Sequence, residues 1–165
     1  MNPLLELTKQ GQSIWLDYIR RGFLTSGDFK RLMEEDGIRG VTSNPSIFEK
    51  AIDGATDYDE GLRALVAKTP RMDTGALYDC LTIEDVRMAA DLLRRSFDLS
   101  RGADGYVSIE PPPQSTKGTE ATIKEVLRLW DAVNRPNLMV KVVTSRLEHV
   151  LSSCQLRRKT RTYRP

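Results

Sequence analysis

The order of its apolar segments is the feature that most limits what this chain can fold into. Four short apolar runs, typical of β-strands, lie at residues 13–18, 38–44, 104–110 and 137–143. Between them lie longer segments whose apolar residues recur at helical spacing. Strands that alternate with helices in this way are typical of parallel βαβ units. The pattern therefore predicts an α/β fold in which helices cover a parallel sheet.

The helical segments are predicted from apolar periodicity and from residues that start or stop helices. They lie at residues 2–11, 26–37, 45–52, 57–68, 82–97 and 119–133. In the second of these, Ser26 is a candidate N-cap and Gly37 a stop signal. In the helix predicted at 82–97, Thr82 and Asp85 have the spacing of a capping pair, which predicts that this helix begins near Thr82.

Composition narrows the class of protein further. A chain of 165 residues can form one domain with a core, and 39% hydrophobic with 29% charged residues is typical of a globular protein. No apolar run approaches the roughly 20 residues that span a bilayer, and the N-terminus does not resemble a signal peptide. Cys80 and Cys154 form neither a disulfide framework nor a zinc site. These features predict a cytoplasmic protein without a membrane span.

Charge is distributed unevenly along the chain. The formal net charge is +2, but residues 146–165 contain six lysines and arginines against one glutamate. The rest of the chain is therefore slightly acidic, which argues against a dedicated nucleic-acid-binding protein.

Lys141 interrupts the apolar run Asn137-Leu138-Met139-Val140 and Val142-Val143. Lysine is almost never fully buried without a partner or a function. One interpretation places it on an edge strand with the ammonium group in water. The other places it in a desolvated site, where burial lowers the pKa and yields a neutral amine that attacks a sugar ketone to form a Schiff base.

Two carboxylates also lie at the ends of predicted strands. Glu110 ends the run "YVSIE", where it is either a solvated side chain or a general acid and base. Asp17 lies among apolar residues in "IWLDY", where it either pairs with an arginine such as Arg20 or acts as a base toward a substrate hydroxyl. Strand ends are where a parallel barrel collects its catalytic groups.

The most distinctive string is "GVTSNPSIFEKAI", residues 40–52. Asn44 followed by Pro45 predicts an N-cap, and Ser46 with Glu49 offers a capping box as the alternative start of the same helix. Asn44 is also a candidate to bind a substrate hydroxyl. That role is compatible with capping because strand-to-helix turns face the mouth of a barrel.

Five strings resemble the transaldolase family in its common bacterial form. They are "QSIWLDYIRRGFL", "IRGVTSNPSIFEKAI", "IEDVRMAADLLR", "ADGYVSIE" and "NRPNLMVKV", and they occur in the family's order from about residue 4 to Val142. The resemblance implies the N-terminal half of a (β/α)₈ barrel. It also implies that Lys141 is the Schiff-base lysine, Glu110 the acid and base, Asp17 the carboxylate on the first strand, and Asn44 the substrate-binding asparagine.

The family's activity follows from the same resemblance. It implies transfer of a dihydroxyacetone unit between sugar phosphates in the pentose phosphate pathway, with no metal and no cofactor. The implied partners are fructose 6-phosphate, sedoheptulose 7-phosphate, erythrose 4-phosphate and glyceraldehyde 3-phosphate. A class I aldolase that cleaves without transfer is the alternative within enzymes. A different class is a non-catalytic protein whose basic tail binds nucleic acid or a membrane, and another is the product of a pseudogene.

The sequence departs from the family pattern at three places. Glu110 is followed by Pro111-Pro112-Pro113, which stiffens the loop after it, and Gly118 replaces an acidic residue before Thr119. After Val142 the chain matches no family motif, as if truncated after the fourth strand. We expect a partial barrel at 1–145 and, at 146–165, a disordered basic tail or a short helix. A frame shift, a short paralogue and an error in the sequence are alternative origins, and the missing strands, which carry the family's phosphate-binding arginines, predict impaired or absent activity.

Overall fold

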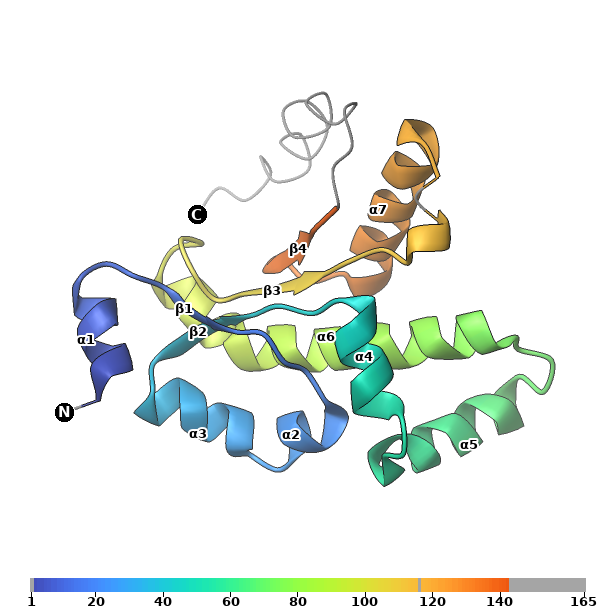
Figure 1. Cartoon of the computed structure of the whole chain (residues 1–165), viewed down its shortest axis with the longest axis horizontal. Helices are drawn as coiled ribbons and strands as arrows, with labels where there is room; N and C mark the ends of the chain where they lie inside the picture. The colour runs from blue at the N-terminus through green and yellow to red at the C-terminus, as the bar shows by residue number, and fades with distance from the viewer. Residues whose placement is uncertain (1, 116, 143–165) are drawn as a thin grey trace.

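Four parallel strands form one sheet in the order β1-β2-β3-β4 (Figure 1). The computed structural model describes residues 2–115 and 117–142, so the predicted tail at 146–165 lies outside the described residues. The strands are β1 (Ile14–Leu16), β2 (Ile38–Val41), β3 (Tyr106–Ile109) and β4 (Leu138–Val140). This is the arrangement of the N-terminal half of a (β/α)₈ barrel, which confirms the predicted fold class.

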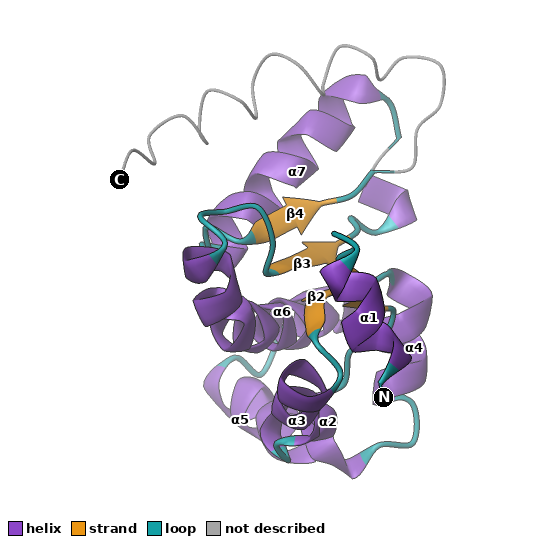
Figure 2. Cartoon of the chain, turned by 90° about the vertical axis from the view of Figure 1, so that its left-hand side faces the viewer, coloured by secondary structure: helices purple, strands orange, loops and turns teal. Residues whose placement is uncertain are grey.

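Helices cover one face of the sheet, and further helices lie at both ends of its strands. The helical elements are α1 (Pro3–Lys9), α2 (Arg21–Thr25), α3 (Asp28–Glu35), α4 (Pro45–Ile52), η1 (Thr56–Tyr58), α5 (Asp59–Lys68), α6 (Thr74–Leu99), η2 (Pro113–Ser115) and α7 (Thr119–Val133). α6 packs along β2 and β3, α7 beside β4, and α3 against β2. α1 lies near the N-terminal ends of the strands, and α4 lies at their C-terminal ends (Figures 1 and 2). Within the described residues, no helix has the length and apolarity to cross a membrane.

The face of the sheet that meets the helices forms the core. Val41 pairs in register with Val107, and Val107 pairs with Leu138, so the three side chains point to the same face. All three are buried, together with the apolar side of α6. Ala89 and Ala90 are fully buried on that side, and their small side chains let α6 approach the sheet closely.

The opposite face of the sheet is polar toward the C-terminal ends of the strands. Side chains alternate along a strand, and Ser108 pairs in register with Met139, so both point away from the core residues. The next residues on that face are Glu110 after β3 and Lys141 after β4. In a closed barrel this face would be the interior, which is where strand-end catalytic groups lie.

Two predicted helix starts were wrong. α6 begins at Thr74 with Asp73 as its N-cap, whose side chain accepts a hydrogen bond from the Ala76 N–H at 2.9 Å. Thr82 and Asp85 therefore lie buried in the helix interior and do not cap it. α3 begins after Gly27 in the left-handed region rather than after Ser26, although the Ser26 hydroxyl still accepts a bond from the Asp28 N–H.

Gly40 on β2 allows the indole of Trp15 to lie directly against the backbone of the neighbouring strand. A Cβ added at Gly40 would lie 2.3 Å from Trp15 Cδ2. We expect Gly40→Ala to lower the free energy of unfolding by about 1–3 kcal/mol, because the indole must leave its position. Urea unfolding measures the effect. The double variant Trp15→Leu/Gly40→Ala should lose less than the sum of the two single losses, and strict additivity would contradict this account.

Candidate active site

Backbone hydrogen bonds keep the chain in register just beyond the strands. The Thr42 N–H donates to the Leu16 carbonyl at 2.8 Å, and the Lys141 N–H donates to the Ile109 carbonyl at 2.9 Å. The residues that directly follow β1, β3 and β4 are therefore held at the same edge of the sheet. They are Asp17, Glu110 and Lys141.

Glu110 and Lys141 form an ion pair on neighbouring strand ends. Lys141 Nζ lies 2.6 Å from Glu110 Oε1, and the side chains are 60% and 13% exposed, respectively. The hydrogen bond and charge of Glu110, and then the charge of Asp17, raise the pKa of Lys141 above its ordinary value. The interpretation of Lys141 as a desolvated amine with a lowered pKa does not hold in the described structure, because β4 is the outer strand of the described sheet and leaves the ammonium group open to water. Of the two interpretations of Lys141, the structure has the edge-strand one.

Asp17 belongs to the same charged group of side chains. Its Oδ1 accepts a hydrogen bond from the Thr42 hydroxyl at 2.5 Å, and its charge contributes to the raised pKa of Lys141. The proposed pairing of Asp17 with Arg20 is not present. Arg20 instead makes a bidentate ion pair with Asp57, at 2.7 and 2.8 Å.

Asn44 is the N-cap of α4. Its side-chain oxygen accepts a hydrogen bond from the Ile47 N–H at 2.9 Å, and Pro45 occupies the first position of the helix. This excludes Ser46 with Glu49 as the capping box. Asn44 lies three residues beyond β2, at the same end of the sheet as the ion pair, and its described side-chain hydrogen bond is to the backbone of α4 rather than to Lys141.

The geometry of the ion pair permits direct proton transfer. At 2.6 Å, the Glu110 carboxylate can take a proton from the Lys141 ammonium and return it without an intervening water. The carboxylate reaches Lys141 even though Pro111 follows it immediately. Among the described residues, no group of histidine, cysteine, aspartate and glutamate side chains could hold a metal ion.

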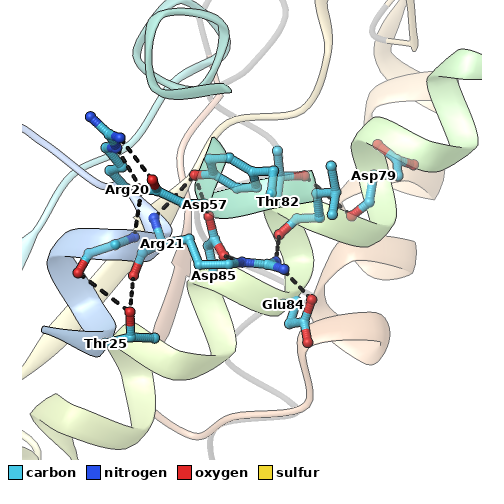
Figure 3. Close-up of polar contacts among 11 residues, drawn as sticks. Arg20, Arg21, Thr25, Asp57, Asp79, Thr82, Glu84 and Asp85 are labelled. Atoms are coloured by element: carbon cyan, nitrogen blue, oxygen red, sulfur yellow. Dashed lines mark hydrogen bonds and ion pairs between the residues drawn. The ribbon is translucent and has the colours of Figure 1, made fainter. Parts of the chain in front are cut away.

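A second polar cluster lies on the helix side and was not predicted from the sequence (Figure 3). The fully buried Asp85 of α6 accepts hydrogen bonds from Arg21 Nε at 2.8 Å and from the Tyr58 hydroxyl at 2.7 Å. The Tyr58 hydroxyl also accepts from the Arg21 N–H, and Glu84 pairs with the same guanidinium at 2.7 Å. The cluster joins α2, η1 and α6.

The titration of this cluster reflects its burial. Burial raises the pKa of Asp85, and the Tyr58 hydroxyl and the Arg21 guanidinium oppose that rise. Burial, and then the Asp85 carboxylate, raise the pKa of Tyr58. Burial works to lower the pKa of Arg21, but the charges of Asp85 and Glu84 outweigh it, so that this pKa rises. The guanidinium also lies 5.0 Å from the centre of the Tyr58 ring, within the range of a cation–π contact.

The described residues thus form half of a parallel (β/α) barrel with a lysine and two carboxylates at its strand ends. Comparison with known proteins identifies the family. Residues 14–147 match the family model described as transaldolase/fructose-6-phosphate aldolase. The chain belongs to this family.

Individual relatives agree with the family match. The chain is 43% identical over 141 residues to a transaldolase of Trichodesmium erythraeum. The matched residues make up 86% of this chain and 37% of the relative. It is 45% identical to transaldolase 2 of Nostoc punctiforme, over 86% of this chain and 36% of the relative. It is 43% identical to a transaldolase of Thiobacillus denitrificans, over 86% of this chain and 39% of the relative. The chain thus spans well under half the length of these relatives.

Proposed function

We propose that this chain carries the Schiff-base half of a transaldolase site, with Lys141 as the nucleophile. The observation that carries the proposal is the 2.6 Å contact between Lys141 Nζ and Glu110 Oε1 at the ends of adjacent parallel strands. It combines an amine with a carboxylate that can move its proton. The family match and the names of the relatives support the same reaction.

Imine formation begins from the ionised pair. Glu110 takes a proton from Lys141, and the neutral amine attacks the carbonyl carbon of a ketose phosphate. A nitrogen–carbon bond forms, and the carbonyl oxygen takes a proton from the attacking nitrogen, which gives a neutral carbinolamine with a hydroxyl group. Glu110 then returns its proton to this hydroxyl, which leaves as water, so that a protonated imine remains on Lys141.

Carbon–carbon cleavage then requires a base and an electron sink. Asp17 takes the proton from the hydroxyl group on the carbon beyond the scissile bond. That bond breaks, an aldose phosphate departs as the aldehyde, and the electron pair moves into the imine to form an enamine. The enamine attacks the aldehyde of a second aldose phosphate, Asp17 returns the proton, and water releases the new ketose from Lys141.

The proposed donors are fructose 6-phosphate and sedoheptulose 7-phosphate, and the proposed acceptors are erythrose 4-phosphate and glyceraldehyde 3-phosphate, as in the pentose phosphate pathway. Asn44 is proposed to bind a sugar hydroxyl through its side-chain Nδ2, because the N-cap bond uses the side-chain oxygen. Asp17, Glu110 and Lys141 together carry one net negative charge when all are ionised. The sugar phosphate must therefore place its phosphate away from these three side chains.

We further propose that this chain alone turns over slowly. The Lys141 side chain is 60% exposed and its pKa is raised, so the neutral amine is a small fraction of the population near pH 7. A water-exposed site also weakens the electrostatic stabilisation of charged intermediates.

A coupled assay tests the reaction class. With fructose 6-phosphate as donor, glyceraldehyde 3-phosphate release should be slow and should depend on added erythrose 4-phosphate. Release at an equal rate without an acceptor would contradict transfer and would favour the aldolase named with transaldolase in the matched family. Activity equal to that of a full-length relative would contradict the proposed impairment.

A further inference from the structure

Asn137, the residue just before β4, is completely buried and joins three parts of the fold. Its side-chain Nδ2 donates hydrogen bonds to the Ala90 carbonyl at 2.8 Å and to the Gly105 carbonyl at 2.9 Å. Ala90 lies in the middle of α6, and Gly105 directly precedes β3. One amide group thus ties the start of β4 to the helix layer and to the neighbouring strand.

The backbone of Asn137 holds the same neighbour. Its carbonyl accepts a hydrogen bond from the Val107 N–H at 3.0 Å. The Gly105 N–H in turn donates to the Arg39 carbonyl of β2, also at 3.0 Å. The starts of β2, β3 and β4 are therefore connected through Gly105, and Asn137 is the side chain that attaches β4.

Lys141 depends on this attachment because β4 is short. In the described part of the chain, β3 and β4 pair through three residue pairs, which begin with Val107 opposite Leu138 and end with Ile109 opposite Val140. A slip of one residue would move Lys141 by about 3.3 Å along the sheet and turn its side chain to the other face. Either change would break its 2.6 Å contact with Glu110.

We propose that Asn137 is a positioning residue that sets the register of β4 against β3 and so places Lys141 Nζ beside Glu110. It acts through backbone placement and touches neither the amine nor the carboxylate. The inference takes its functional meaning from the proposed role of Lys141. The test is made on the protein without substrate, so that the positioning role of Asn137 and the catalytic role of Lys141 can fail separately.

The titration of Lys141 reports the contact directly. The charged side chains that act on Lys141 are Glu110 and Asp17, so NMR of ¹³C-labelled lysine should show a raised midpoint in the unmodified chain. Glu110→Gln removes the main cause and gives a lower benchmark midpoint. We expect Asn137→Ala to move the midpoint most of the way to this benchmark. Asn137→Ser, which keeps a hydrogen-bond donor, should give a midpoint between those of the unmodified chain and Asn137→Ala.

Arg135→Ala is the matched control. Arg135 connects the loop between α7 and β4 to α6 through a bidentate ion pair with Asp91. Its described side-chain bonds do not include one to β3. Its removal should leave the Lys141 midpoint at the value of the unmodified chain. An unchanged midpoint in Asn137→Ala or Asn137→Ser, in a chain that circular dichroism shows to be folded, would overturn the proposal.

A measurement on the unmodified chain covers the case in which neither variant folds. The side-chain amide protons of Asn137 should exchange with solvent at least about 100-fold more slowly than those of the half-buried Asn44. Exchange at equal rates would show that the anchor is absent and would overturn the proposal. Failure to trap an imine on Lys141, with the titration results as expected, would refute the proposed function and leave the positioning role intact.

Discussion

Asp85→Ala is expected to lower the free energy of unfolding by about 3–5 kcal/mol, because it removes the buried carboxylate that binds both the largely buried Arg21 guanidinium and the Tyr58 hydroxyl. Asp85 is fully buried and receives hydrogen bonds from Arg21 and Tyr58. Removal of the carboxylate leaves the buried Tyr58 hydroxyl and Arg21 Nε without this acceptor, although Glu84 still pairs with the guanidinium. Domains of this size are stable by only about 5–15 kcal/mol, so the variant should unfold at a much lower urea concentration or fail to fold.

The neighbouring Glu84→Ala separates the buried pair from a general loss of charge. Glu84 binds the same guanidinium at 2.7 Å, but its side chain is 56% exposed. Its removal should change the free energy of unfolding by less than about 1 kcal/mol. If the two alanine variants had similar urea midpoints, the account of Asp85 as a structural anchor would be wrong.

Loss of the proposed nucleophile should have the largest effect on chemistry. Lys141→Met keeps a long apolar side chain and removes the amine. The turnover rate and the amount of trapped imine should therefore fall by about 1,000-fold or more. Stability should change little, because the Lys141 side chain is mostly exposed. The amount of reduced covalent adduct formed with borohydride and fructose 6-phosphate, determined by intact-protein mass spectrometry, measures the effect.

An exposed lysine elsewhere provides the control for Lys141→Met. Lys124 lies on the exposed side of α7, and Lys124→Met should trap the donor at the rate of the unmodified chain. Equal loss in the two variants would mean that trapping reflects general lysine reactivity. Retained trapping in Lys141→Met would assign the chemistry to another residue.

The sheet could be predicted from the sequence because each strand is marked by residues that are neighbours in the chain. Each strand is a short apolar run between helical segments, and all four lie inside the predicted ranges. The start of α6 could not be placed in this way. Thr82 and Asp85 have the spacing of a cap, but Asp73, nine residues before Thr82, is the cap that forms, since the helical segment continues through residues 74–81.

The chemistry of the site was only partly accessible from the sequence. The strand-end positions of Asp17, Glu110 and Lys141 follow from the alternation of strands and helices. The pKa of Lys141 does not, because it depends on how much of the side chain the neighbouring elements cover. The Arg21–Asp85 pair was missed because its members lie 64 residues apart and no short motif connects them.

The location of the trapped donor decides whether Lys141 is the Schiff-base residue. The unmodified chain is treated with fructose 6-phosphate and borohydride, digested, and mapped by mass spectrometry. We predict one reduced dihydroxyacetone adduct, on the peptide that contains Lys141, with formation faster as the pH rises and the amine loses its proton. An adduct mainly on another lysine, or none at any pH at which the chain stays folded, would contradict the assignment of Lys141 as the Schiff-base residue.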